Sequence, residues 1–147
     1  MKTIVRIVVV TIFAVASQAQ PGAKIDRARM AAEVKAEFLH AWNGYKKYAW
    51  GHDDLKPISK SYRDWHPPET VLMTAVDSLD SLYLLGLKKE ADATRKYITA
   101  NLSFDKDIDV QNFEITIRVL GGLISGYQAS GDKKLLALAD DLGRRLL

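Results

Sequence analysis

The sequence of 147 residues contains no cysteine. This absence excludes disulfide bonds as a source of stability and excludes catalysis by a cysteine–histidine pair. Histidines are also few, and the three that are present, His40, His52 and His66, show no metal-ligand spacing and support no serine–histidine–aspartate arrangement. A hydrophobic core must therefore stabilise the fold, and a chain of this length can form one domain with such a core.

The sequence also lacks a large excess of either charge. It has 21 basic and 18 acidic residues, which gives a net charge of +3. Two of the basic residues, Lys2 and Arg6, lie in an N-terminal segment that we expect to be removed, and without them the excess is +1. Such a small charge does not indicate a nucleic-acid partner, which would require a pronounced basic patch.

The hydrophobic run near the N-terminus is too short to span a membrane. This uncharged run, residues 7–16, has ten residues, whereas a bilayer requires about 20. Basic residues precede it and small residues follow it up to Ala19, a pattern that is typical of a secretory signal peptide. We therefore predict that residues 1–19 are a cleaved signal peptide. The mature protein is then expected to be secreted or periplasmic, without a stable membrane span; an uncleaved N-terminal anchor is the alternative.

Helical periodicity dominates the rest of the chain. Apolar residues recur at intervals of three and four, a pattern that predicts amphipathic helices. Five helices are expected, at about residues 28–48, 69–85, 88–101, 110–129 and from residue 132 onward. We expect Pro68 in the first turn of the second helix, Gly86 at its end, and Gly131 followed by Asp132 between the last two helices. Residues 50–68, which contain three of the four prolines, are predicted to lack regular structure.

The helices differ in how their polar residues are distributed. The second and fourth are apolar around most of their circumference, whereas the third and fifth carry many charges. Such alternation is typical of an all-α fold in which inner helices with a thin polar stripe alternate with outer helices that face solvent. An α-solenoid of stacked hairpins would also alternate, although the sequence shows no internal repeat. On the fourth helix, Phe113, Ile117 and Ile124 belong to the expected apolar face.

The two apolar helices carry the candidate functional residues. On the fourth, Glu114 and Arg118 are the only charged residues between Asp109 and Asp132, and their spacing places them on one face. On the second, Asp77 lies in a narrow polar stripe. The other members of this stripe are the small hydroxyl residues Thr74, Ser78 and Ser81. Burying charges costs several kcal/mol per ion unless other interactions compensate, so a functional pocket is one reason to keep them. The alternatives are a structural ion pair on the fourth helix, and an interhelical contact or helix cap for Asp77.

One acidic segment partly fits a calcium-binding loop. Residues 105–116 have aspartate at the first, third and fifth positions. However, Val110 occupies the position of the required glycine, and Thr116 occupies that of the bidentate glutamate. No metal ligand is therefore predicted in this chain.

Four segments, in order, resemble glycoside hydrolase family 47, the class I α-mannosidases, which cleave α-1,2-linked mannose. They are FLHAWNGYKKYAWGHDDLKPISK (38–60), AVDSLDSLYLLGL (75–87), LSFDKDIDVQNFEITIRVLGGLISGYQASGD (102–132) and ALADDLGRRLL (137–147). The resemblance identifies residues 34–147 as the N-terminal portion of the catalytic domain, and residues 20–33 as a polar lead-in.

The resemblance implies an (α/α)7 barrel of inner and outer helices, of which this chain would form an incomplete part. It also implies an inverting glycosidase that acts on α-1,2-linked mannose oligosaccharides. By their match to the family motifs, Glu114 would be the general acid, Arg118 would line the sugar pocket, and Asp77 would be an essential acidic residue.

The family also uses Ca²⁺, which binds at the bottom of the barrel and contacts mannose hydroxyls. The resemblance places the calcium ligands and the general base beyond Leu147, so this chain alone is expected to be inactive. The alternative function is a non-catalytic helical module that binds a glycan or a protein.

Overall fold

The computed structural model describes residues 25–147. The predicted signal peptide, residues 1–19, lies outside the described residues. Within them, no helix combines the length and the apolar character that a membrane span requires.

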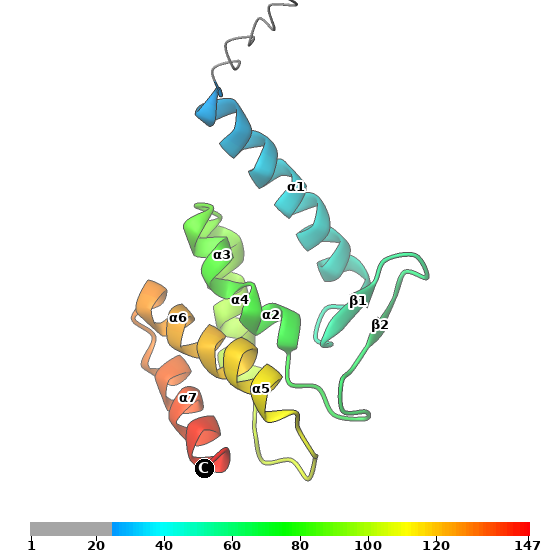
Figure 1. Cartoon of the computed structure of the whole chain (residues 1–147), viewed down its shortest axis with the longest axis vertical. Helices are drawn as coiled ribbons and strands as arrows, with labels where there is room; N and C mark the ends of the chain where they lie inside the picture. Colours follow the sequence, from blue (N-terminus) through cyan, green and yellow to red (C-terminus); the bar gives the residue numbers. More distant parts are fainter. Residues whose placement is uncertain (1–24) are drawn as a thin grey trace, which may run out of the picture.

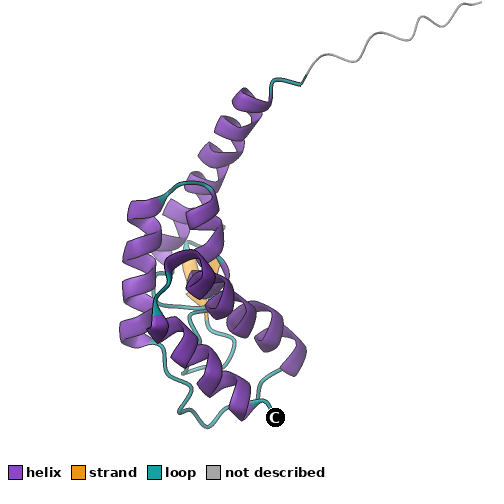
Figure 2. Ribbon diagram, turned by 90° about the vertical axis from the view of Figure 1, so that its left-hand side faces the viewer, coloured by secondary structure: helices purple, strands orange, loops and turns teal. Residues whose placement is uncertain are grey.

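Helices account for most of the described chain, in agreement with the predicted all-α class (Figures 1 and 2). In chain order the elements are α1 (Arg27–Tyr48), β1 (Asp54–Lys56), β2 (Ser61–Arg63), α2 (Met73–Asp77), α3 (Leu79–Leu84), α4 (Lys88–Asn101), α5 (Asn112–Glu114), η1 (Ile115–Leu120), α6 (Gly121–Ser130) and α7 (Lys133–Arg145). The π-helix η1 joins α5 to α6 without interruption, so these three elements form one helix. The two short strands are an addition to the predicted class.

The helices form two layers, as the alternation of apolar and charged helices predicts. In the inner layer, α2 and α3 lie beside η1 and α6. In the outer layer, α4 packs on α3, α7 packs on α6, and α4 also contacts α7 (Figure 1). The largest fully buried side chains of these helices are Leu79, Leu82, Ile98, Leu123 and Leu135. Each such side chain stabilises the fold by about 1.5–3 kcal/mol, so the two layers are held together mainly by aliphatic burial.

Helix α1 packs against the rest of the protein only through its C-terminal half (Figures 1 and 2). Trp42 and Tyr45 are each 3% exposed there, whereas Met30 and Val34 are 48% and 58% exposed. The indole N–H of Trp42 donates a hydrogen bond to Glu90 of α4 at 3.2 Å. The predicted apolar stripe of this helix is therefore buried at one end and open at the other.

The prediction that residues 50–68 lack regular structure is wrong in part. Strands β1 and β2 form an antiparallel hairpin in which Asp54 pairs with Arg63, and the side chains of these two residues also form an ion pair. The prolines do not prevent this pairing. Pro57 follows β1 in the turn, where no N–H group is needed for the strand pairing, and the other two prolines come after β2.

The second helix begins later than predicted and is interrupted. Pro68 is not in a helix, and α2 starts only at Met73. Leu72, just before it, has a left-handed backbone with φ of 53°, a conformation that is strained for a large side chain. Ser78, with φ of −91° and ψ of −6°, separates α2 from α3. Interactions from outside the helix must hold the strained residue in place.

The buried carboxylate of Asp53 provides these interactions. Its Oδ1 accepts hydrogen bonds from the hydroxyl of Thr70 at 2.8 Å and from the backbone N–H of Val71 at 2.9 Å. The same oxygen accepts from the N–H of Met73 at 3.0 Å, and Oδ2 accepts from the N–H of Trp65 at 3.0 Å. Asp53 is 0% exposed, so these four hydrogen bonds replace the water that its carboxylate has lost. They attach the segment before α2, and Trp65 just after the hairpin, to the residue that precedes the hairpin.

The continuous helix α5–η1–α6, which corresponds to the fourth predicted helix, buries a different side from the one predicted. The large apolar residues that are exposed on it are Phe113, Ile117 and Ile124. Val119 and Leu123 are fully buried instead, and Gly122 and Gly126 lie on the same buried side. The two glycines have no side chain, which lets α2 and α3 approach this side closely. A search for large hydrophobic side chains does not detect packing of this kind.

Two predicted helix boundaries are confirmed. Gly86 follows α3 with φ of 68°, and Gly131 follows α6 with φ of 72°. The N–H of Gly131 donates to the carbonyl of Tyr127 at 2.7 Å, as expected for a glycine that ends a helix. The carboxylate of Asp132 accepts from the N–H of Lys134 at 3.0 Å and so caps the start of α7.

Replacing Asp53 by alanine should strongly destabilise the protein, because two buried and two partly buried donors lose their acceptor. Each unsatisfied buried group costs about 1–3 kcal/mol, so we expect the free energy of unfolding to fall by about 4 kcal/mol. Asp53→Asn should have a smaller effect. Its amide oxygen can still accept the three hydrogen bonds made to Oδ1, and only the N–H of Trp65 would then face a second donor, the amide nitrogen. Urea denaturation measures both changes.

The matched control is Asp54→Asn, the neighbouring residue on the surface of the hairpin. Asp54 is 28% exposed and accepts from Arg63 and from the indole N–H of Trp65 at 2.8 Å, both of which an asparagine oxygen can still accept, so the loss should be about 1 kcal/mol. Equal losses in Asp53→Ala and Asp54→Asn would contradict the role given to the buried carboxylate.

Candidate active site

Two neighbouring helices of the inner layer hold the three predicted site residues. Asp77 is the last residue of α2, Glu114 ends α5, and Arg118 lies in the π-helix η1. Helix α2 packs against η1, so Asp77 and Arg118 meet although they are 41 positions apart in the sequence.

The guanidinium of Arg118 joins the two carboxylates. Its Nε donates a hydrogen bond to Oε2 of Glu114 at 2.7 Å, and its Nη1 donates to Oδ2 of Asp77 at 3.1 Å. These hydrogen bonds, first that to Glu114 and then that to Asp77, raise the pKa of Arg118 above its ordinary value. The guanidinium therefore stays positively charged and links the two helices in what we name the Asp77–Arg118–Glu114 cluster.

The cluster lies on an accessible surface. The side chains of Asp77, Arg118 and Glu114 are 41%, 39% and 24% exposed. The expectation that these charges are buried is therefore wrong. Because solvent screens such contacts, they contribute only about 0–1 kcal/mol each to stability. The same exposure makes all three side chains reachable by a ligand.

The contacts of the cluster include those that a purely structural interpretation predicts. Glu114 and Arg118 form the i,i+4 ion pair, and Asp77 makes an interhelical contact. The structure adds that both contacts share one guanidinium. Two acidic groups held by one base on adjacent helices form an arrangement that can bind and orient a polar ligand.

The cluster does not by itself suit a calcium ion. Calcium prefers six to eight oxygen ligands, whereas here a guanidinium sits between the carboxylates and would repel a cation. Across residues 25–147, no group of three or more histidine, aspartate or glutamate side chains is placed so as to hold a metal ion.

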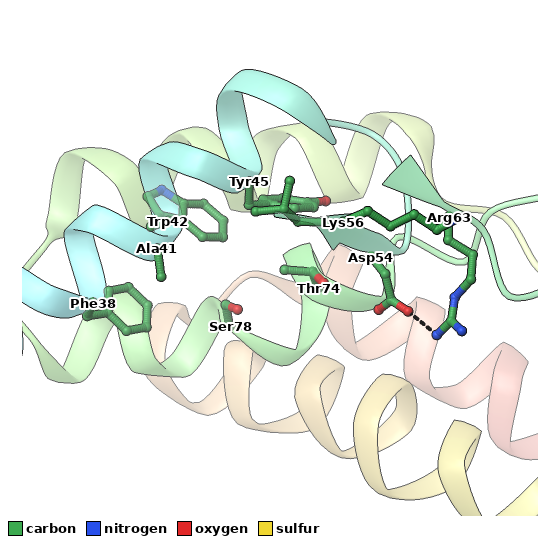
Figure 3. Close-up of a pocket in the computed structure, with 10 residues that line it drawn as sticks. Phe38, Ala41, Trp42, Tyr45, Asp54, Lys56, Arg63, Thr74 and Ser78 are labelled. Atoms are coloured by element: carbon green, nitrogen blue, oxygen red, sulfur yellow. Dashed lines mark hydrogen bonds and ion pairs between the residues drawn. The ribbon is translucent and has the colours of Figure 1, made fainter. Parts of the chain in front are cut away.

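A cavity of about 440 Å³ lies between α1, the hairpin and α2. Figure 3 shows Phe38 and Tyr45 of α1 on one side of it, with Thr74 of α2 and Ser78, which follows α2, opposite. Burial raises the pKa of the Tyr45 phenol, which stays neutral and donates to the carbonyl of His52 at 2.8 Å. The predicted polar stripe of the second helix is thus divided: Thr74 and Ser78 line this cavity, whereas Ser81 and Asp77 do not.

Two packing features near the cluster are not identified by the sequence analysis. Asp53 looks like any other acid of a polar loop, because the residues that donate to it follow 12 to 20 positions later. Gly122 and Gly126 do carry a readable signal, since two glycines four residues apart on an apolar helix allow close packing on one side.

Comparison with known proteins gives consistent results. The chain matches the family model described as glycosyl hydrolase family 47 over residues 37–147. It is 51% identical over 110 residues to the endoplasmic reticulum mannosyl-oligosaccharide 1,2-alpha-mannosidase of Homo sapiens, a match that covers 75% of this chain and 15% of that protein. It is 47% identical over 115 residues to the mannosyl-oligosaccharide 1,2-alpha-mannosidase MNS1 of Arabidopsis thaliana, covering 78% of this chain and 20% of that protein.

The fold agrees with these matches. The solved structure of an alpha-1,2-mannosidase from Trichoderma reesei is similar with a TM-score of 0.63 and 32% sequence identity, over 81% of this chain and 26% of that one. The chain therefore spans between 15% and 26% of the length of these relatives. Its two helix layers are part of an (α/α)7 barrel, as predicted. The chain belongs to glycosyl hydrolase family 47.

Proposed function

We propose that this chain provides part of the catalytic domain of an inverting mannosyl-oligosaccharide 1,2-α-mannosidase. The observation that carries the proposal is the contact of one guanidinium, that of Arg118, with the carboxylates of both Asp77 and Glu114 on an accessible surface. Family membership and the names of the relatives support α-1,2-linked mannose oligosaccharides as the substrate class.

Glu114 is proposed as the general acid. In an inverting glycosidase, one carboxylic acid protonates the leaving oxygen while a second carboxylate activates water on the opposite face of the sugar. Oε2 of Glu114 accepts from Arg118, and among residues 25–147 no donor forms a hydrogen bond to Oε1. Oε1 is therefore the oxygen that can carry the proton to a glycosidic oxygen. The general base is not assigned to any residue of this chain.

Arg118 is proposed to orient the sugar. A guanidinium has five N–H groups in a fixed plane, and the Nε–H and one of the Nη1–H groups contact the carboxylates. The remaining N–H groups are available to donate to mannose hydroxyls. Asp77 binds the guanidinium from the neighbouring helix. This contact helps to keep Arg118 at a fixed position relative to Glu114.

Calcium dependence is implied by the family resemblance, and the ion would contact sugar hydroxyls. The described residues of this chain do not form a ligand set for it. The roles proposed for Asp77, Glu114 and Arg118 therefore do not involve the ion.

The proposed location is the secretory route, ending in secretion or in the periplasm. The support is the signal peptide predicted for residues 1–19, together with the word endoplasmic reticulum in the name of a relative. An oligosaccharide-processing glycosidase is expected to meet its glycans in that compartment.

The general-acid role predicts a loss that depends on the leaving group. In the catalytic domain that contains these residues, Glu114→Gln should lower kcat for α-1,2-mannobiose by about 10² to 10⁴-fold, because the amide keeps the shape but has no acidic proton. α-Mannosyl fluoride, whose leaving group needs little protonation, should be hydrolysed with a much smaller loss. Release of mannose from the two substrates is the measurement.

Glu33→Gln is the matched control, since Glu33 is an exposed glutamate in an i,i+4 pair with Arg29 on α1. It should retain the parent rate on both substrates. Equal losses of Glu114→Gln on both substrates would contradict the acid role, and a parent-like rate on mannobiose would contradict any catalytic role. Binding of mannobiose without hydrolysis by the parent protein would favour the non-catalytic module.

Arg118→Lys separates the geometry of the guanidinium from its charge. Lysine keeps the positive charge but cannot donate to two carboxylates in the fixed plane of arginine. We expect kcat/KM to fall by about 10²-fold through misplacement of the sugar. The free energy of unfolding should change by about 1 kcal/mol or less, because the contacts are half-exposed.

Steady-state kinetics and urea denaturation check the two halves of this expectation. Arg144→Lys is the control, since Arg144 forms an exposed i,i+4 pair with Asp140 and should affect neither quantity. Parent-like kcat/KM in Arg118→Lys would show that only the charge at this position matters.

A further inference from the structure

We propose that Gly122 is a positioning residue that sets the distance between Asp77 and Arg118. The inference rests on the proposed function in one respect, because it concerns the geometry of the same cluster. The evidence for it is the packing of two helix backbones, which does not depend on the chemistry of the cluster.

At Gly122, the backbones of α6 and α2 are in direct contact. A Cβ atom at this position would lie 2.8 Å from the carbonyl oxygen of Val76 and 3.1 Å from its carbonyl carbon. Both are backbone atoms of α2, so they cannot turn away as the end of a flexible side chain can. Glycine is therefore the residue that permits this separation of the two helices.

The contact lies next to the cluster on both helices. On α2, Val76 directly precedes Asp77. On the other helix, Gly122 follows Arg118 by four residues, which is about one turn. A displacement of the two backbones at this contact therefore displaces Asp77 and Arg118 relative to each other.

The size of the effect follows from the contact distance. Ordinary contact begins near 3.4 Å, so an alanine at position 122 requires the helices to separate by roughly 0.6 Å. The distance of 3.1 Å between Nη1 of Arg118 and Oδ2 of Asp77 would then exceed about 3.6 Å, beyond hydrogen-bond range. Arg118 cannot follow freely, because Glu114 on its own helix holds its Nε.

Two other glycines of α6 serve as controls. A Cβ at Gly121 would meet only the carbonyl oxygen of Thr116, at an ordinary 3.6 Å, so Gly121→Ala tests the change in helix propensity alone. A Cβ at Gly126 would lie 2.6 Å from Cδ2 of Leu79, which is the end of a flexible side chain. Gly126→Ala therefore tests tight packing one turn farther from the cluster.

The experiment uses crystal structures and double-mutant cycles in the three alanine variants. Asp77→Asn and Arg118→Gln, singly and together, give the coupling between the two side chains from urea unfolding. For a half-exposed pair this coupling is about 1.4- to 5-fold in the unfolding constant. In Gly122→Ala the coupling should disappear and the distance between the two side chains should lengthen, whereas Gly121→Ala and Gly126→Ala should retain both. The coupling of Glu114 to Arg118 lies within one helix and should persist in all three variants.

A rescue distinguishes positioning from general destabilisation. Asp77→Glu lengthens the acid by one methylene and should restore the contact and its coupling in the Gly122→Ala background. If Gly122→Ala does not unfold cooperatively, the same set is made with Val76→Ala added. That change removes the contact of a Cβ with Cγ1 of Val76 at 2.9 Å and leaves the backbone contact in place.

An unchanged distance and coupling in Gly122→Ala would overturn the proposal, as would an equal loss in Gly126→Ala or a failure of the longer acid to restore the contact. None of these readouts involves catalysis. The positioning role can therefore fail while Glu114→Gln still shows the loss expected of a general acid, and the acid role can fail while the positioning role stands.

Discussion

The buried carboxylate of Asp53 constrains the position of the first inner helix. It is sealed from solvent, so it needs donors from the protein, and the N–H groups of Val71 and Met73 point toward it because the preceding segment is not helical. Meeting this requirement delays the start of α2 and holds Leu72 in a left-handed conformation. The helix that results is just over one turn long, and Asp77 is its last residue. The hydrogen bonds that Asp53 requires thus determine where α2 begins and, through this short helix, where Asp77 lies.

The protein uses its acidic residues in two different electrostatic settings. The carboxylate of Asp53 is surrounded by neutral donors in the interior, where each hydrogen bond is strong because no water competes. Asp77 and Glu114 share a charged partner at the surface, where solvent weakens each contact. Replacing Asp53 should therefore affect folding, whereas replacing Asp77 or Glu114 should affect mainly what the surface can bind. Stability and the proposed chemistry are in this way assigned to different residues, although both depend on the placement of one short helix.

Features that depend on near neighbours in the sequence could be predicted, and those that depend on distant contacts could not. The pairing of Glu114 with Arg118 follows from their spacing, and the boundary at Gly131 follows from capping. That Asp77 lies near Arg118 agrees with the polar stripes predicted for the two inner helices, whereas the direct contact between their side chains could not be read from periodicity. The delayed start of α2 depends on Asp53 finding donors far along the chain. For the helix α5–η1–α6, the hydrophobic pattern predicts that the side with large apolar residues is buried. That prediction is wrong because the observed packing depends on glycines, which have no side chain. The roles of the three cluster residues stay predictions.

The π-helical stretch at Ile115–Leu120 accommodates an additional residue between Glu114 and the part of the helix that packs in the core. A π-helical turn accommodates one residue more than an α-helical turn, and one residue corresponds to about 100° of rotation around the axis. The stretch therefore behaves like a one-residue insertion between two otherwise regular helical segments. Deleting a single residue there would let the stretch close into an α-helix, in which one residue fewer makes the same total rotation. Glu114 and the contact of Gly122 with Val76 would then keep nearly their present directions. The widened turn therefore lets this helix carry one additional residue between its acidic side chain and its packed end without changing the alignment of either.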